Sequence, residues 1–184
     1  MTNIINGWFS QASQHPTTQC DERPDPEDIS LMVLHCISLP PGEFGGEWIS
    51  RLFDGSLPGA AHPYFEGIQS LRVSAHILIR RDGSMIQYVP FQKRAWHAGV
   101  SRYQDRTHCN DFSIGIELEG TDTLPYEGLQ YTALSGLIQA LIQHYPRLTT
   151  DTITSHSSIA PGRKTDPGPG FDWDMLRELL QTAR

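Results

Sequence analysis

The stretch Leu31-Met32-Val33-Leu34-His35-Cys36-Ile37 is a short apolar run interrupted by one histidine. A run of this length and composition is typical of a strand that is buried on both faces of a sheet. The sequence Pro-Pro-Gly at 40–42 follows at once and ends any regular strand. We therefore expect a central strand over residues 31–37 that places His35 inside the protein or at the strand's end.

A second strand is predicted at residues 111–119, which read Asp-Phe-Ser-Ile-Gly-Ile-Glu-Leu-Glu. Alternate side chains of a strand point to opposite faces. One face then carries Phe112, Ile114, Ile116 and Leu118, and the other carries Ser113, Gly115, Glu117 and Glu119. An ionised carboxylate buried without a partner is costly, so we expect Glu117 to face a polar site.

The other elements alternate between strand and helix patterns. Residues 73–80 and 84–89 read as a hairpin around the turn dipeptide Asp82-Gly83. Helices are predicted from Trp48 through Phe53, over about 127–145 up to Pro146, and after the N-cap Asp172 with Trp173, Leu176 and Leu180 inward. Residues 54–67 are rich in Gly and Pro and read as a long loop.

This mixture shows neither strict βαβ alternation nor an internal repeat, which favours an α/β (α+β) fold with a central mixed β-sheet flanked by helices. A chain of 184 residues suits one core. We expect a single domain, 1–184. Prolines among acidic residues predict that residues 1–29 form an extended lead-in over the surface. Residues 30–184 are then expected to form the catalytic core.

Composition and charge limit the classes of binding partner and the cellular compartment that we expect. A formal charge of −7 without a basic cluster argues against nucleic acid. No run of about 18 apolar residues suggests a membrane span, and residues 1–14 lack an export signal, so a cytoplasmic protein without an obligate protein partner is expected. Cys20, Cys36 and Cys109 have no CxxC spacing and are expected to be reduced thiols, with Cys36 buried.

The stretch Thr154–Trp173 reads Thr-Ser-His-Ser-Ser-Ile-Ala-Pro-Gly-Arg-Lys-Thr-Asp-Pro-Gly-Pro-Gly-Phe-Asp-Trp. So much proline and glycine predicts an ordered loop, neither helix nor sheet, that presents side chains in a fixed geometry. With His35, the loop's His156 and Asp166 would make a three-ligand zinc site. A fourth position that stays open for water marks a catalytic rather than a structural zinc. The net positive charge of such a centre lowers the pKa of the bound water from about 16 toward 7.

Each histidine has a structural alternative. Buried His35 needs its ring nitrogens satisfied, by a metal or by hydrogen bonds. His76 in the hairpin and His97 in Trp-His-Ala-Gly could line a pocket and are weaker metal candidates. The remaining four, in polar loops or at a helix end, are expected to be structural or solvent-facing: His15, His62, His108 and His144.

Hydrolysis also needs a proton carrier and a cation that stabilises the oxyanion. Glu117 and Glu119 lie on the same face of the predicted strand, and the residues leave both open as the base, with a buried salt bridge as the alternative for Glu117. Lys164, two residues before Asp166, could reach the reacting oxygen, although a loop lysine is more often solvated.

The chain resembles a known family nearly end to end. The motifs are His35 with Ser-Leu-Pro-Pro-Gly-Glu-Phe-Gly-Gly at 38–46, Ser-Ala-His at 74–76, Ala-Trp-His-Ala-Gly at 95–99, residues 110–122, Ile-Ala-Pro at 159–161, 164–169 and Phe-Asp-Trp at 171–173. They resemble the AmpD-type 1,6-anhydro-N-acetylmuramyl-L-alanine amidases. These belong to a zinc amidase superfamily with the peptidoglycan recognition proteins and phage lysozyme-type amidases.

The resemblance implies roles and a substrate. One zinc ion would be held by His35, His156 and Asp166, with Glu117 rather than Glu119 as acid/base and Lys164 as oxyanion stabiliser. The bond cut would join (1,6-anhydro) N-acetylmuramic acid to L-alanine in a muropeptide during cytoplasmic peptidoglycan recycling. Arg72 and Trp96 would border the groove, the arginine suited to a peptide carboxylate and the indole to a sugar face.

One departure and two alternatives remain. The position after the first ligand is often Asn in relatives and is Cys36 here, which removes an amide that could bind the peptide. A non-catalytic muropeptide-binding module would not need the three ligands together with Glu117 and Lys164. A lytic amidase acting on intact cell wall would share the chemistry and differ in where it works.

Overall fold

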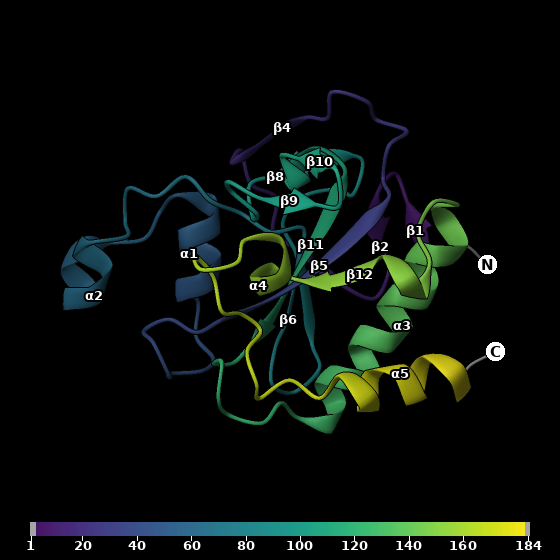
Figure 1. Cartoon of the computed structure of the whole chain (residues 1–184). Coiled ribbons are helices and arrows are strands. Elements are labelled where there is room, and N and C mark those ends of the chain that lie inside the picture. Colours follow the sequence, from purple (N-terminus) through teal and green to yellow (C-terminus); the bar gives the residue numbers. More distant parts are fainter. Residues whose placement is uncertain (1–2, 183–184) are drawn as a thin grey trace.

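The structure, a computed structural model, describes residues 3–182, so positions 1–2 and 183–184 of the predicted domain lie outside the described residues. One mixed sheet forms its centre, with strand order β12-β5-β11-β6-β7-β3 (Figure 1). Its strands are β12 (Ile153–Ser155), β5 (Leu31–Ile37), β11 (Ser113–Glu119), β6 (Ile77–Ile79), β7 (Met85–Gln87) and β3 (Ser13–Gln14). The predicted α+β fold with a central mixed sheet is confirmed.

The two strands predicted from apolar runs pair at the middle of this sheet. Strand β11 lies parallel to β5, and Glu117 is the register partner of His35. Met32 and Leu34 pack into the main core on one face, while Leu31 and Val33 pack into a smaller cluster on the other. The strand is therefore buried on both faces, as predicted, and His35 and Glu117 lie side by side.

The predicted hairpin is present but shorter than expected. Strands β6 and β7 are antiparallel, and Gly83 in the turn has φ +81°, a conformation that favours glycine. The strand begins only at Ile77, because Ser74 bonds elsewhere: Ser74 N donates to Trp96 O and Ser74 Oγ donates to Gln19 O. His76 O still accepts from Tyr88 N across the hairpin.

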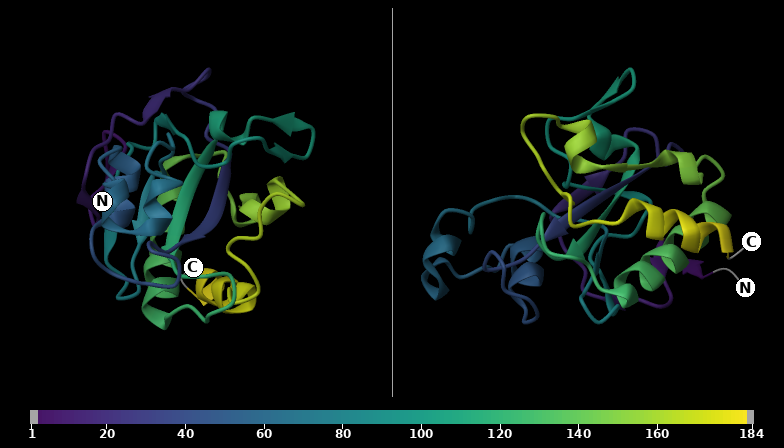
Figure 2. Two further views of the ribbon diagram at one scale, coloured as in Figure 1. Left: turned by 90° about the vertical axis from the view of Figure 1, so that its left-hand side faces the viewer. Right: turned by 60° about the horizontal axis from the view of Figure 1, so that its bottom comes forward.

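Helices cover both faces of the sheet (Figures 1 and 2). Helices α3 (Gly128–His144) and α5 (Trp173–Thr182) close the main core, with Leu134, Leu141 and Leu176 buried. Helix α1 (Trp48–Asp54) packs Leu52 and Phe53 into a second core cluster. All three helices were predicted, and Asp172 caps α5 as expected, because Asp172 Oδ1 accepts from Asp174 N and Met175 N.

Two segments predicted as irregular contain helix. In 54–67 the chain forms η1 (Gly59–Ala61) and α2 (Pro63–Glu66), since Pro63 suits a first helical turn and His62 Nδ1 accepts from Tyr64 N. In 154–173 the first residues belong to β12, and His156 begins α4 (His156–Ile159), capped by Ser155 Oγ. The irregular loop begins only after Ile159, where the first proline of the stretch follows at Pro161.

Residues 3–29 run along the core and add short strands to it. These are β1 (Ile4–Ile5), β2 (Trp8–Phe9), β3 and β4 (Cys20–Glu22), and β3 forms one edge of the main sheet. Ile4 and Phe9 are buried in the same core as β5 and β11. The boundary at residue 29 stays a prediction. The remaining elements are β8 (Lys93–Ala95), β9 (Arg102–Tyr103), β10 (Arg106–Thr107), η2 (Cys109–Asp111) and η3 (Thr150–Thr152).

The burial of the cysteines differs from the prediction, and the helices can be checked for a membrane span. Cys36 is only half-buried, because it lies where β5 reaches the wall of a cavity, and Cys109 is the fully buried cysteine, so the expectation for Cys36 was wrong. Over residues 3–182 no helix combines the length and the apolar character needed to cross a membrane.

Arg23 ties the N-terminal segment to the central strand. Its guanidinium is buried and donates to the backbone carbonyls of Phe91, Asn110, Asp111 and Ser113. Burial lowers the pKa of Arg23 to about 10, so the group is still charged at neutral pH. One side chain therefore satisfies the carbonyl groups that lead into β11.

Replacing Arg23 with methionine should lower the free energy of unfolding by about 3 kcal/mol or more, because several buried carbonyls lose their donor at once. Urea denaturation measures this as a lower midpoint at unchanged slope. Arg102→Met, at an exposed arginine, is the control and should change the value by less than about 0.5 kcal/mol. A loss below about 1 kcal/mol for Arg23→Met would contradict the role given to it.

Candidate metal centre and catalytic pocket

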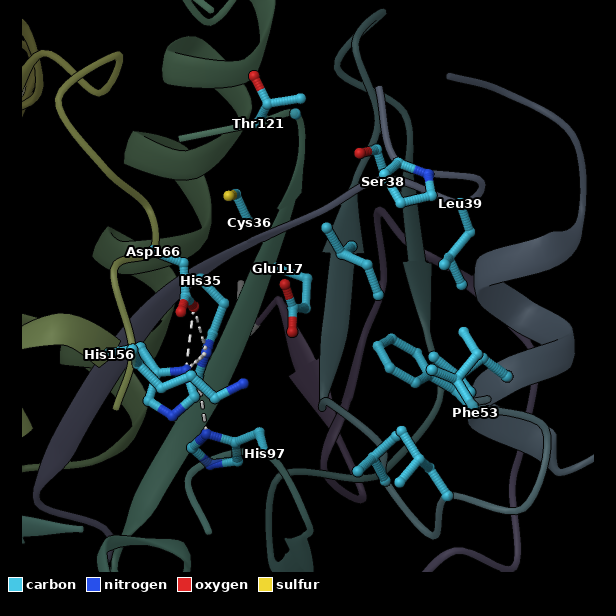
Figure 3. A pocket seen from close by; sticks show the side chains of 18 of the residues that line it. His35, Cys36, Ser38, Leu39, Phe53, His97, Glu117, Thr121, His156 and Asp166 are labelled. Atoms are coloured by element: carbon cyan, nitrogen blue, oxygen red, sulfur yellow. Dashed lines mark hydrogen bonds and ion pairs between the residues drawn. The ribbon is translucent and has the colours of Figure 1, made fainter. Parts of the chain in front are cut away.

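Three side chains predicted as ligands converge at the carboxyl end of the central strands (Figure 3). His35 comes from β5, His156 from the first turn of α4, and Asp166 from the loop that follows it. His35 Nδ1 lies 2.9 Å from His156 Nδ1 and 3.1 Å from Asp166 Oδ2, and His156 Nδ1 lies 3.0 Å from the same oxygen. The three atoms form a nearly equilateral triangle.

The donor set and its spacing fit a zinc ion. Tetrahedral zinc with bonds of about 2.0–2.2 Å keeps its ligand atoms a little over 3 Å apart, close to the sides of this triangle. His156 Nε2 lies 3.2 Å from Ala98 O, which can only accept, so Nε2 carries a proton and Nδ1 is the nitrogen that can offer a lone pair to a metal. Two imidazoles and one carboxylate leave a fourth position for a reacting molecule.

The protonation states suit metal binding. Burial lowers the pKa of His35 to about 4, so its ring is neutral at neutral pH. Burial alone would raise the pKa of Asp166, but the neighbouring rings of His156 and His35 outweigh it and hold the pKa of that carboxyl well below its usual range. The site therefore presents a neutral His35 ring beside an ionised carboxylate.

Glu117 lies beside the cluster on β11 and has an unpaired oxygen. Its side chain is 8% exposed, and Oε2 has no hydrogen-bond partner within residues 3–182. Burial raises the pKa of Glu117 well above its ordinary value, and the charge of Asp166 raises it further. A carboxyl group of this kind keeps its proton to a higher pH than an ordinary glutamate does and can release it to a neighbouring atom.

Glu119, the competing base, is engaged in structural contacts. Its Oε1 accepts from Gly45 N at 2.6 Å and from Arg80 Nη1 at 3.4 Å, and its Oε2 accepts from Arg81 N at 3.2 Å. Both oxygens are satisfied, and Glu119 is absent from the lining of the cavity that Glu117 borders. The geometry thus favours Glu117, which the sequence alone could not choose.

A cavity of about 570 Å³ opens over the cluster. Lys164 lines it together with Glu117, His35, His156 and Asp166. The opposite wall is apolar and is formed by α1 and the segment after α2, with Leu52, Phe53, Ile68, Leu71 and Val73 (Figure 3). The cavity therefore has a polar reacting end and an apolar wall, as small-molecule sites commonly do.

The two residues expected to border the groove lie together. The guanidinium of Arg72 is 5.1 Å from the ring centre of Trp96 in a cation–π contact. Trp96 lines the cavity, and Arg72 is exposed at its edge. Cys36 also lines the cavity, with its thiol 3.4 Å from Asp122 Oδ1, and burial raises the pKa of that thiol. It therefore offers a neutral thiol to the cavity.

The other histidines divide as follows. His97 lines the cavity and contacts the back of the His35 ring, with His97 Nδ1 2.9 Å from His35 Nε2. His76 is buried away from the cluster, bonded to Gly115 N and Lys93 O. His62 caps α2, His15 bonds to Asp54, and His108 and His144 are exposed, in agreement with the prediction for these four.

Gly115 is a feature of the sequence that points to the position of His97. A Cβ built on Gly115 would lie 2.4 Å from His97 Cγ, so the ring packs directly on the strand backbone. Glycine inside a strand often marks such a close approach. Gly115 in the middle of β11 could therefore have indicated that a bulky side chain crosses the strand beside Glu117.

An α+β domain that gathers two imidazoles, two carboxyl groups and a lysine around one cavity has the groups of a hydrolase site. Residues 25–169 match the family described as N-acetylmuramoyl-L-alanine amidase. The chain is 61% identical over 177 residues to the 1,6-anhydro-N-acetylmuramyl-L-alanine amidase AmpD of Citrobacter freundii, covering 96% of this chain and 94% of that protein.

Solved structures agree with this match. A selenomethionine derivative of AmpD has a TM-score of 0.94 at 60% identity and covers 96% of this chain and 98% of its own. The amidase AmiD from Escherichia coli, in complex with the substrate anhydro-N-acetylmuramic acid-L-Ala-D-gamma-Glu-L-Lys, has a TM-score of 0.64 at 29% identity, over 83% of this chain and 57% of that one. The chain belongs to the N-acetylmuramoyl-L-alanine amidase family, and it is a muropeptide amidase.

Glu117 and Glu119 should affect stability in opposite directions. In the metal-free protein Glu117→Gln should raise Tm at pH 8, because it removes a buried carboxylate that lacks a partner. Glu119→Gln should lower the free energy of unfolding by about 1–3 kcal/mol, because an amide NH₂ would face an N–H donor. Thermal and urea unfolding measure both changes.

The Glu117→Gln effect should depend on pH with a defined sign. The folded-state pKa is raised, so between the ordinary value of 4.5 and the raised value the native state binds a proton that the unfolded chain lacks. Wild-type stability relative to Glu117→Gln therefore falls as pH rises through this window, and the two proteins converge below pH 4.5. A difference that is constant from pH 4 to 8 would contradict the buried, unpaired carboxyl.

Proposed function

We propose that the protein is a zinc-dependent amidase that cleaves the amide between 1,6-anhydro-N-acetylmuramic acid and L-alanine during peptidoglycan recycling in the cytoplasm. The observation that supports it most is the triangle of His35 Nδ1, His156 Nδ1 and Asp166 Oδ2 beside an unpaired glutamate. The high identity to AmpD over nearly the full chain supports the anhydro-sugar substrate.

His35, His156 and Asp166 would hold the metal. Zinc bound there would supply Lewis acidity, which polarises a carbonyl and lowers the pKa of water. The chain's own part is to keep the His35 ring neutral, through its burial, and Asp166 ionised, through the two neighbouring histidines.

Glu117 would move the proton. Its carboxylate takes a proton from the attacking water, and its raised pKa lets it hold that proton until the amine leaves. The register that places it opposite His35 keeps this transfer within the reacting end of the cavity.

Lys164 would stabilise the oxyanion. The residue is exposed on the loop between the ligands His156 and Asp166 and lines the same cavity. Its backbone N–H donates to Ala160 O at 3.1 Å, which fixes the turn that carries the side chain. An ammonium group placed there favours negative charge on the attacked carbonyl oxygen.

Trp96 and Arg72 would bind the substrate rather than take part in the chemistry. The indole lines the cavity, and the stacked guanidinium at its edge can meet a carboxylate. The polar end beside Cys36 and Asp122 would face the peptide.

The zinc content and the catalytic activity of single variants should distinguish the predicted ligands from the predicted catalytic residues. The wild type should bind one zinc, and His35→Ala and Asp166→Ala should lose it. Glu117→Ala and Lys164→Ala should keep the zinc and lower kcat on anhydro-muramyl peptide by at least about 100-fold, because each removes a transition-state interaction. Elemental analysis and a product assay measure the two properties.

The matched control is Lys93→Ala, which removes a surface lysine paired with Glu22 and should leave both properties unchanged. A wild-type protein that holds no zinc and is not activated by it would refute the proposal. Loss of zinc from Glu117→Ala or Lys164→Ala would mean that a ligand had been mistaken for a catalyst. Higher activity on insoluble sacculi than on soluble anhydro-muropeptide would favour the lytic alternative.

Substrate-binding residues should change KM more than kcat. Trp96→Ala should raise KM for anhydro-muramyl peptide by about 10-fold or more, because burying an aromatic face against a sugar contributes on the order of 1–2 kcal/mol of binding. Steady-state kinetics measure both constants. Trp173→Ala, outside the cavity, is the control, and equal losses in kcat and kcat/KM for Trp96→Ala would assign it to the chemistry instead.

A further inference from the structure

The polar groups behind His35 form a hydrogen-bonded chain that ends on the backbone. His35 Nε2 lies 2.9 Å from His97 Nδ1, His97 Nε2 lies 3.2 Å from Ser113 Oγ, and Ser113 Oγ lies 2.5 Å from Cys109 O. His35, Ser113 and Cys109 are each at most 1% exposed. His97, which joins them, is partly buried and lines the cavity.

The carbonyl of Cys109 at the far end of this hydrogen-bonded chain determines which atom donates at each link. A carbonyl oxygen only accepts hydrogen bonds, so the Ser113 hydroxyl donates to Cys109 O and its lone pair faces His97 Nε2. His97 must then carry its proton on Nε2 and offer a lone pair at Nδ1. His35 donates from Nε2 to that lone pair, and its own Nδ1 is left without a proton.

The ring of His156, the second histidine of the cluster, is oriented by Ala98, the residue that follows His97. Ala98 O accepts from His156 Nε2 at 3.2 Å and from Arg163 Nη2 at 2.7 Å. Asn110 Oδ1 accepts from both His97 N and Ala98 N, at 3.1 and 2.8 Å, and so holds this dipeptide in place. Two adjacent residues therefore contact the rear nitrogens of both imidazoles.

We propose that His97 is a positioning residue that fixes the ring of His35 with its Nδ1 lone pair toward His156 and Asp166, and that the His97-Ala98 dipeptide, anchored by Asn110, presets both imidazoles for the metal. The inference rests on the proposed zinc site. It assigns His97 no contact with substrate and no place among the ligands, because its ring faces the side of His35 opposite Nδ1.

This arrangement explains the strand glycine. The His97 ring lies against Gly115, and any side chain there would push the ring off His35. It also explains why three acceptor atoms meet without a donor between them: both imidazoles are locked with lone pairs inward, against an ionised Asp166. A cation is the group that satisfies three converging lone pairs.

Zinc affinity tests the inference without relying on turnover. In competition with a chelating dye, His97→Leu should bind zinc about 10–100-fold more weakly than the wild type, as loss of a second-layer partner typically does. His97→Asn should stay within about threefold of the wild type, because its Oδ1 can accept at the position of Nδ1. Ser113→Ala should fall between them.

The matched control is Ser135→Ala, which removes a buried serine whose hydroxyl bonds only to Thr132 O within α3. Urea unfolding of each metal-free variant shows whether it is folded. Equal affinity of His97→Leu and wild type would overturn this inference and leave the zinc site standing. A wild type without zinc affinity would overturn both.

A measurement on the wild type avoids any folding defect of the variants. Long-range ¹H–¹⁵N correlation at neutral pH should show His35, His97 and His156 protonated on Nε2 in the metal-free protein, and zinc should shift Nδ1 of His35 and His156 only. A proton on His97 Nδ1, or zinc bound by His35 Nε2 together with His97 Nδ1, would overturn the proposed direction of the chain.

Discussion

The pairing of β5 with β11 is the constraint on which the site depends. In a sheet a slip of one residue moves every side chain to the other face. Met32 and Leu34 on one strand, and Ile114 and Ile116 on the other, are buried against α3 and α5, so the register is fixed by the core. With this register His35 and Glu117 become neighbours on the opposite face, where the cavity lies.

Several groups around that pair have energetically unfavourable surroundings. Glu117 is buried with an unpaired oxygen, and three acceptor atoms converge within hydrogen-bond distance of one another. Such features destabilise a fold unless the surrounding structure enforces them, and they commonly occur at functional sites. Here Arg23, Asn110 and the Cys109 carbonyl hold the segments behind the site through buried hydrogen bonds. The stable part of the structure therefore lies directly behind the reactive part.

Much of this was readable from the sequence because it follows from local patterns. The apolar run at 31–37 and the alternation at 111–119 predicted the two central strands, and spacing predicted α1, α3 and α5. The ligand candidates could be chosen from residue types, since His156 and Asp166 lie in one unusual stretch. The choice between Glu117 and Glu119 could not, because both lie on one face and differ only in contacts made by distant residues, Gly45 and Arg81. His97 was undervalued for the same reason: its partners at 35 and 113 are far apart in sequence.

The central claim is that His35, His156 and Asp166 form one zinc site through His35 Nδ1, His156 Nδ1 and Asp166 Oδ2. Anomalous diffraction from zinc-loaded crystals, recorded on both sides of the zinc absorption edge, tests it most directly. The account predicts one strong anomalous peak at about 2.0–2.2 Å from each of these three atoms, with a fourth position open to the cavity that Glu117 and Lys164 line. A peak bonded to other residues, or no peak from protein that has been loaded with zinc, would contradict it.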